Sequence, residues 1–192
     1  DGGAFQREKV LVLTFNAVCV FMQTLDSRLL FLSLSLLHTV AGKTLPMVYR
    51  VWAWTLNALA TGEHPTHDHL QKAFSLKHHP KRFAMAGKKL TPQGHCGVWS
   101  ELRGDWKWQY EALLLEDHWQ SDYICHLCRA HKKRRRLLYT QFTRAAHVRK
   151  THISWARFRD YLELHPEDRS WLTTIIGFTT WRCWVDLMHN LD

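Results

Sequence analysis

Two short apolar runs near the start of the chain predict a β-hairpin. Residues 9–20 (KVLVLTFNAVCV) are rich in Val, Leu and Phe, and the run is too short and too continuous for a surface helix, which favours a buried strand. Residues 29–40 alternate leucine with serine at their centre, which suits a strand with one less buried face. The polar residues 23–28 between the two runs predict the connection of the hairpin.

The next segment predicts an amphipathic helix. Thr44 is a favourable N-cap, and Pro46 suits a first helical turn. Apolar residues then recur at spacings of three and four until Gly62, which predicts the end of the helix. We expect this helix to be structural and to cover a sheet.

Residues 64–97 break this regularity. The segment is polar, basic and rich in histidine and proline, which predicts a long irregular insertion between core elements. His64, His67 and His69 have a spacing that could bind a metal ion, and solvated loop histidines are the alternative.

The second half of the chain alternates short predicted elements. Together with the first half they indicate an α/β fold. The pattern predicts, in order, a strand at 98–103 that ends at Gly104-Asp105, helices at 106–118 and 151–164, an apolar β-branched segment at 171–178 and a helix at 181–191.

Composition narrows the class of protein. The 192 residues suffice for one domain with a real core, and ten tryptophans exclude a disordered chain. The formal net charge of +9, with fourteen histidines besides, favours a polyanionic partner such as nucleic acid, and a basic but inert surface is the alternative. No apolar run is long enough for a membrane span, and no signal peptide is visible. No small-molecule substrate is evident.

The cysteines and the chain start add two expectations. Five cysteines, an odd number, do not fit a secreted disulfide framework, so a reducing compartment is expected. The chain begins with Asp1 rather than methionine, and we expect it to be a fragment of a longer protein.

Cys125 and Cys128 have the spacing at which two thiolates reach one Zn²⁺ ion. A second ligand pair about twenty residues later would complete a structural site. Two packed, unliganded thiols are the alternative, and a redox role is less favoured because no thioredoxin-like pattern surrounds the pair. The predicted ligands are Cys125, Cys128, His147 and His152, with His131 or His126 as reserves.

A dense basic segment follows the cysteine pair. Charges this close repel one another unless they are solvated or paired with phosphate, and Tyr139, Phe142 and Trp155 are interleaved where they could stack on bases. A nuclear-localisation signal is an equally simple interpretation, and we expect a nuclear protein. The predicted nucleic-acid-binding residues are Lys132, Lys133, Arg134, Arg135, Arg136, Arg144, Arg149 and Lys150.

Asp105 is the candidate catalytic residue that the pattern itself offers. An acid at the end of a buried strand lies at a sheet edge, where it can share two Mg²⁺ or Mn²⁺ ions for phosphodiester cleavage. The alternative is that Asp105 caps the helix that begins at Trp106.

This layout resembles the RNase H-like core of DDE/D cut-and-paste transposases of the CACTA, hAT and Kyakuja–Dileera–Zisupton kind. Asp1-Gly2 precedes two strands and a helix, Gly104-Asp105 ends a later strand, and Cys125-His-Leu-Cys128 follows. Asp186-Leu-Met-His189 looks like the Asp-x-Met-His segment of such transposases. The resemblance implies one RNase H-like domain over 1–192, a mixed sheet flanked by helices, with a Cys/His basic insertion at 119–152.

The resemblance also implies an activity. Asp1, Asp105 and a third acid, either Asp186 or a residue beyond Asp192, would hold Mg²⁺ or Mn²⁺ for cleavage and transfer of DNA strands, with Zn²⁺ as the structural ion. Two alternatives stay open: a degenerate element that only binds nucleic acid with zinc, and a zinc-stabilised protein-interaction module. DNA is the expected partner, and the oligomeric state, including a homo-oligomer, stays open.

Overall fold

The computed structural model describes residues 10–16, 28–117, 120–141 and 143–185. The chain divides into two compact units, Asp1–Leu45 and Pro46–Asp192. Both helices and short strands are present, which confirms a fold of mixed α and β structure. The prediction of one RNase H-like domain with two insertions stays a prediction.

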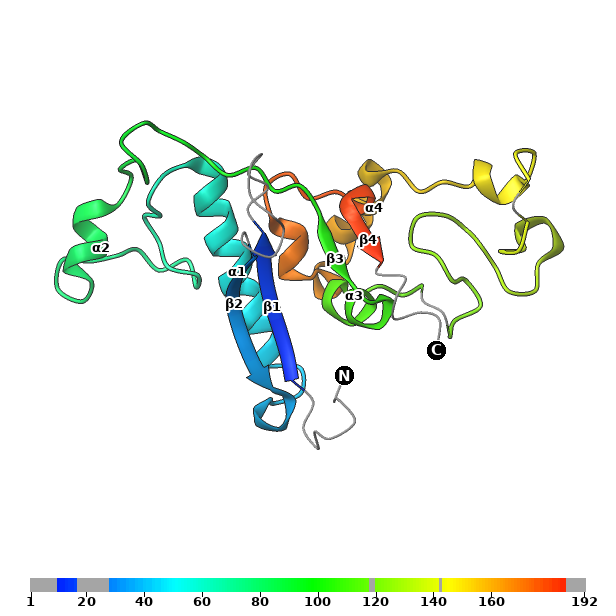
Figure 1. Cartoon of the computed structure of the whole chain (residues 1–192), viewed down its shortest axis with the longest axis horizontal. Coiled ribbons are helices and arrows are strands. Elements are labelled where there is room, and N and C mark those ends of the chain that lie inside the picture. The colour runs from blue at the N-terminus through cyan, green and yellow to red at the C-terminus, as the bar shows by residue number, and fades with distance from the viewer. Residues whose placement is uncertain (1–9, 17–27, 118–119, 142, 186–192) are drawn as a thin grey trace. The chain divides into compact units, whose positions relative to one another are not determined.

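The first unit contains the predicted hairpin. Strand β1 (Val10–Asn16) pairs antiparallel with β2 (Arg28–Ser35), in a register from Val10 opposite Ser35 to Asn16 opposite Arg28 (Figure 1). The register shifts between Leu13 and Thr14. The prediction of two strands is confirmed over these residues, although the end of the second run, Leu36–His38, is a 3-10 helix. The predicted connection at 23–28 lies almost entirely outside the described residues.

Helix α1 (Thr44–Thr61) matches its prediction closely. Its buried residues Tyr49, Trp52 and Ala53 form one face. The helix ends where Gly62 adopts a φ of +70°, a conformation that side chains rarely take. A Cβ atom at Gly62 would also lie 3.1 Å from the carbonyl oxygen of His95, so both conformation and space favour glycine there.

The core of the second unit is built from elements that are far apart in the sequence. Strand β3 (Leu102–Gly104), helix α3 (Trp106–Leu113), helix α4 (Trp155–Leu164) and the 3-10 helix Trp171–Thr174 surround it together with α1. Its buried apolar residues are Tyr49, Trp52, Ala53, Leu102, Ala112, Leu113, Leu115, Leu162, Leu172, Ile175, Phe178 and Cys183.

Asn57 connects α1 to the segment near residue 175. Its Nδ2 donates to the carbonyl of Thr174 at 3.0 Å, and its Oδ1 accepts from the backbone N–H of Ile176 at 2.7 Å. Arg182 makes a similar long-range contact, because its guanidinium donates to the carbonyl of Trp99 at 2.9 Å. The side chains of Asn57 and Arg182 thereby provide hydrogen-bond partners for backbone groups that lie outside α-helices and strands.

Several predicted boundaries need correction. The strand predicted at 98–103 is only β3, and the helix predicted at 106–118 ends at Leu113, because Leu114 adopts a left-handed conformation with a φ of 55°. Helix α4 begins at Trp155 rather than near 151. Its N-cap is Ser154, whose hydroxyl accepts from the N–H of Arg157 at 3.3 Å. The irregular segment 64–97 contains one unpredicted short helix, α2 (Pro80–Met85).

The helix predicted at 181–191 is wrong over its first residues. Strand β4 (Cys183–Val185) lies there and pairs parallel with β3, with Leu102 opposite Cys183 and Gly104 opposite Val185. Residues 186–191 lie outside the described residues. Among the described residues, no helix combines the length and the apolar character needed to cross a membrane.

Candidate nucleic-acid interface

Cys125 and Cys128 lie in a tight turn of the chain. Residues on either side pair across it, because the N–H of Ile124 donates to the carbonyl of Ala130 at 3.0 Å and that of Lys132 to Asp122 at 3.0 Å. Within the turn, the N–H of Leu127 donates to the Sγ of Cys125 at 3.4 Å. Backbone donors aimed at sulfur stabilise a thiolate, the form in which cysteine binds metal ions.

The two thiols interact directly. The hydrogen bond from Cys128 is the main reason that the pKa of Cys125 falls to about 6, and backbone N–H groups of Leu127 and Cys128 add to the effect. The same pairing raises the pKa of Cys128 above its usual range, because its proton is shared with Cys125. One thiolate near neutral pH therefore lies beside a second sulfur at the spacing that a Zn²⁺ ion uses.

The two predicted histidine ligands differ in how close they lie to the cysteine turn. The backbone of His152 pairs with that of Cys128 in an antiparallel bridge, and the N–H of Ile153 donates to Leu127 at 2.9 Å. The His152 ring, however, stacks on Trp181 with a centroid distance of 4.0 Å. His147 is exposed in a 3-10 turn at His147–Lys150.

The four predicted ligands are not gathered in the structure. In the part of the chain that the structure describes, no group of three or more His, Cys, Asp or Glu side chains is placed to hold a metal ion. Two thiolates and two imidazoles are ligand types that Zn²⁺ takes. Closure of the site would need the rings of His147 and His152 to turn toward the sulfurs.

The two reserve histidines have other partners or surroundings. His131 is 5% exposed, and its Nδ1 accepts the backbone N–H groups of Lys133 and Arg134 at 2.9 and 3.2 Å. Its ring also meets Tyr123 edge to face at 4.8 Å. His126 is buried, and burial lowers its pKa to about 4. The sequence predicted His131 as a spare metal ligand at the start of the basic run, but it gave no signal that the His131 ring accepts backbone N–H groups of that run.

A small apolar cluster holds the two ends of the basic segment together. Ala130, Ala146 and Val148 are buried against one another, with Ile124 and both cysteines packed on them. The chain that leaves the cysteine turn therefore returns to it at residues 146–148. The intervening basic residues are carried on a loop that is closed at its base.

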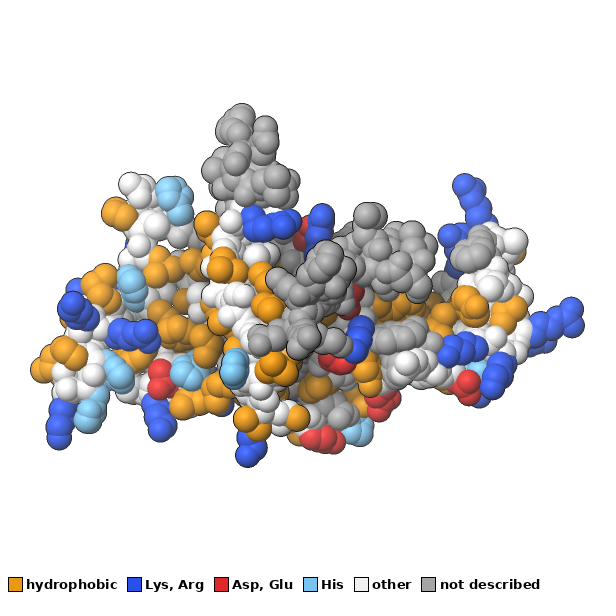
Figure 2. All heavy atoms as spheres, turned by 60° about the horizontal axis from the view of Figure 1, so that its bottom comes forward, with side chains coloured by type: hydrophobic (Ala, Val, Ile, Leu, Met, Phe, Trp, Pro, Cys, Tyr) orange, Lys and Arg blue, Asp and Glu red, His pale blue; other side chains and the backbone are white. Residues whose placement is uncertain are grey.

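The basic side chains project from this loop. Arg144 and the run from Lys133 to Arg136 are exposed, and Lys132 is half-buried; Arg149 and Lys150 are exposed directly after the loop. Lys133 is 4.0 Å from Asp122, with both side chains mostly in solvent, and such a pair neutralises little charge. The guanidinium of Arg134 lies 5.3 Å from the Tyr123 ring centroid. Figure 2 shows Lys and Arg side chains standing out at the right of the view, where Figure 1 draws the yellow segment.

One candidate acid, Asp105, lies at the carboxyl end of a strand pair. Asp105 follows β3 directly and accepts the backbone N–H of Trp108 at 2.6 Å through its Oδ1, so it is the N-cap of α3. Because β3 and β4 are parallel, their carboxyl ends meet at the same edge. Asp1 and Asp186 lie outside the described residues.

The histidine-rich segment is folded around its own backbone contacts. The ring of His67 shares a hydrogen bond with the hydroxyl of Thr66 at 2.8 Å, while the backbone of His67 pairs with that of Ala73. The structure does not bring His64, His67 and His69 together as a ligand set.

Comparison with known proteins adds no relatives. No protein-family model, no curated protein and no solved structure matches this chain.

Proposed function

We propose that this chain is a transposase-derived domain that binds DNA through the basic loop 132–150, carried on a zinc-bound Cys125–Cys128 turn. The observation that carries the proposal is the exposure of five lysine and arginine side chains on a loop closed by the buried cluster of Ala130, Ala146 and Val148, with two more, Arg149 and Lys150, exposed directly after it. Cations of this density contact the phosphate backbone without reading sequence. The same basic run supports a nuclear location.

The closed base of the loop supports binding rather than a free targeting signal. A localisation signal needs only an exposed run, whereas here the Nδ1 of His131 accepts two backbone N–H groups and fixes the direction in which the run leaves the turn. Fixing the loop lowers the entropy lost when it binds DNA. Zn²⁺ would stabilise the same turn through the two sulfurs.

The test is the salt dependence of DNA binding. Each phosphate contact contributes about 0.9 to the slope of log K against log salt, so a variant with Arg134, Arg135 and Arg136 changed to glutamine should lower the slope by up to about 3. The matched control removes the same charge at exposed sites elsewhere, as Lys43→Gln, Lys107→Gln and Arg159→Gln. Equal slopes for the two triple variants would refute the assignment to the loop. Loss of nuclear import with unchanged DNA binding would favour the localisation signal.

A second candidate function, cleavage and transfer of DNA strands, is favoured by the pairing of β3 with β4. Gly104 and Val185 are opposite one another in a parallel ladder, and the next residue in the sequence after each is an aspartate, Asp105 and Asp186. We propose that this pair belongs to an RNase H-like sheet in which the two acids, with Asp1, hold Mg²⁺ or Mn²⁺.

Nicking of supercoiled plasmid with Mg²⁺ or Mn²⁺ tests this second function. The natural chain should nick the plasmid and Asp105→Asn should not. Asparagine keeps the N-cap, so the comparison isolates the charge of the carboxylate. Equal nicking by both proteins removes Asp105 from the chemistry. If the natural chain binds DNA but does not nick it, cleavage is refuted and only the binding function remains.

A further inference from the structure

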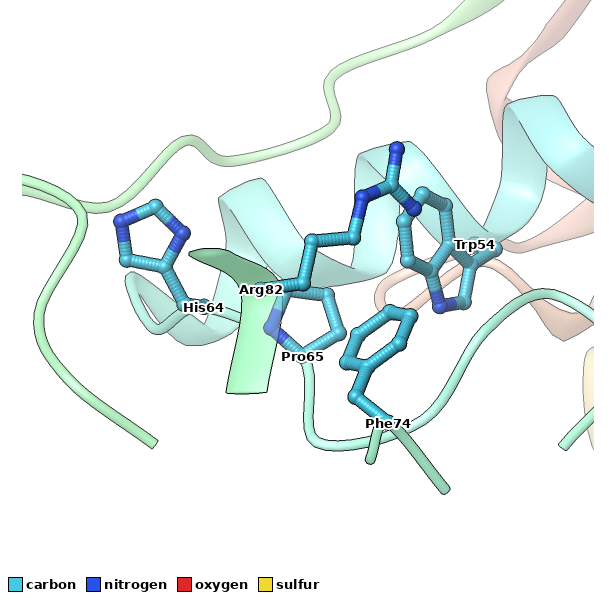
Figure 3. Close-up of a pocket in the computed structure, with 5 residues that line it drawn as sticks. All are labelled: Trp54, His64, Pro65, Phe74 and Arg82. Atoms are coloured by element: carbon cyan, nitrogen blue, oxygen red, sulfur yellow. The ribbon is translucent and has the colours of Figure 1, made fainter. Parts of the chain in front are cut away.

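A small pocket lies among α1, the loop that follows it and α2, away from the basic loop in the sequence. Its volume is about 220 Å³, and Trp54, His64, Pro65, Phe74 and Arg82 line it (Figure 3). Pockets for drug-sized ligands measure roughly 300–1,000 Å³, so this one suits a single planar ring system.

Backbone contacts fix the walls of the pocket. The indole N–H of Trp54 donates to the carbonyl of His67 at 3.0 Å, which holds the indole against the loop. The N–H of Phe74 donates to the carbonyl of Thr66 at 3.1 Å, and the Phe74 side chain is only 7% exposed. His64 is bonded through both its N–H and its carbonyl to the segment after α2. The pocket is therefore formed before any ligand arrives.

Arg82 supplies the charge. Its guanidinium carbon lies 5.4 Å from the ring centroid of Phe74 and 5.8 Å from that of Trp54, and Figure 3 shows it beside both rings. No acidic side chain of the described residues forms an ion pair with Arg82. A guanidinium that lies against aromatic rings keeps its N–H edge available for an oxyanion.

The surroundings favour an anionic ligand. Residues 62–97 contain six lysines and arginines but only two acids, Glu63 and Asp68. The Asp68 carboxylate accepts the backbone N–H groups of Leu70 and Lys72, which lowers its pKa and occupies it. None of the described residues that line the pocket is an acid, so a cationic ligand such as a methylated lysine would lie beside Arg82 without a compensating negative charge.

We propose that this pocket binds one nucleotide of a single-stranded nucleic acid, with the base against Trp54 and Phe74 and the adjacent phosphate on Arg82. Aromatic walls and a cation at this spacing are what stacked bases and their phosphates require. In duplex DNA the base faces are already stacked, so the pocket takes an unpaired end or a displaced strand. This site is separate from the basic loop and goes beyond the function proposed for it.

The experiment compares two neighbouring charge changes in the full chain. Arg82→Gln removes the pocket cation, whereas Lys81→Gln removes an equal charge from the same short helix outside the pocket. Binding of a fluorescein-labelled oligothymidylate and of a duplex is measured by anisotropy. Arg82→Gln should weaken single-strand binding about tenfold, the usual effect of losing a charged hydrogen bond, and Lys81→Gln less than twofold. Neither change should alter duplex binding by more than twofold.

Cross-linking locates the bound base directly. An oligonucleotide that carries 5-iodouracil is bound to the protein, and the complex is irradiated. The cross-linked peptide is then identified by mass spectrometry. Adducts on Trp54 or Phe74 support the proposal. Adducts confined to residues 132–150, equal effects of Arg82→Gln and Lys81→Gln, or preferential binding of a phosphorylated peptide at Arg82 would each overturn it. Circular dichroism of both variants confirms that they are folded.

Discussion

The carboxylate of Asp105 accepts the backbone N–H of Trp108 at 2.6 Å, which makes Asp105 the N-cap of α3. Replacement by alanine should lower the free energy of unfolding by about 1 kcal/mol, because one of the first N–H groups of the helix loses its partner. Replacement by asparagine should change it by only a few tenths, since an amide oxygen caps equally well. Denaturant unfolding of both variants measures the difference.

A surface substitution controls for general effects on α3. Lys107→Ala lies in the same helix and leaves the cap intact. If Asp105→Ala is no less stable than Lys107→Ala, the cap contributes nothing measurable. If Asp105→Asn is as unstable as Asp105→Ala, the charge itself rather than the hydrogen bond supports the helix.

Gly104, the residue before Asp105, allows a second stability test of the start of α3. A Cβ atom built on Gly104 would overlap Cε3 of the Trp108 indole, and it would lie 2.8 Å from Cζ3. Gly104→Ala should therefore lower the free energy of unfolding by about 1–3 kcal/mol, the usual cost of forcing a packed side chain to move. Gly97→Ala is the matched control, because a Cβ atom there meets Leu59 at an ordinary 3.5 Å. Thermal unfolding of the two variants should separate clearly; similar midpoints would show that the indole moves freely.

The parts of the fold that follow from local pattern were predictable. Helix α1 begins at Thr44 and ends before Gly62, close to the predicted bounds, although the Thr44 hydroxyl accepts the backbone N–H of Val40 at 2.9 Å. The two strands of the hairpin lie in the predicted apolar runs. Strand β4 was not predictable, because its partner β3 lies about eighty residues earlier in the chain. Pairing over that distance overrides the local preference of residues 181–185.

The candidate site also has a part that the sequence predicted and a part that it did not. The spacing of Cys125 and Cys128 predicted a pair of adjacent sulfurs, and the structure has their thiols in contact. The positions of His147 and His152 depend on how a loop of twenty residues returns to the turn, which no local spacing records. The pocket around Arg82 also escaped prediction, because its walls come from α1 and from a segment without a regular pattern.

Buried Tyr49 should make the free energy of unfolding of the second unit fall at alkaline pH. Burial raises the pKa of Tyr49 to about 12 from an ordinary value near 10. Between these values the folded protein keeps a proton that the unfolded chain has released, so stability should fall as pH rises from about 10 to 12, by roughly 2–3 kcal/mol. Tyr49→Phe removes this phenol and should flatten the profile of unfolding free energy against pH by that amount.

Lysines and other tyrosines titrate in the same range, so only the difference between the two proteins is informative. Tyr139→Phe is the control, because Tyr139 is 48% exposed. Parallel profiles for the natural chain and Tyr49→Phe would show that the phenol ionises at the same pH whether or not the protein is folded.

The cysteine turn gives the last prediction, which concerns metal removal. Protein purified without chelator should contain about one zinc ion per chain by elemental analysis, and the Cys125→Ser, Cys128→Ser double variant should contain none. Cys96→Ser is the control, because Cys96 is an exposed thiol outside the turn. Since Zn²⁺ would join the turn to the chain that returns near Val148, chelation should expose the buried cluster of Ala130, Ala146 and Val148 to proteolysis and lower the salt slope of DNA binding. A zinc content near zero in the natural chain would remove the metal site, and unchanged proteolysis after chelation would show that apolar packing alone holds the loop.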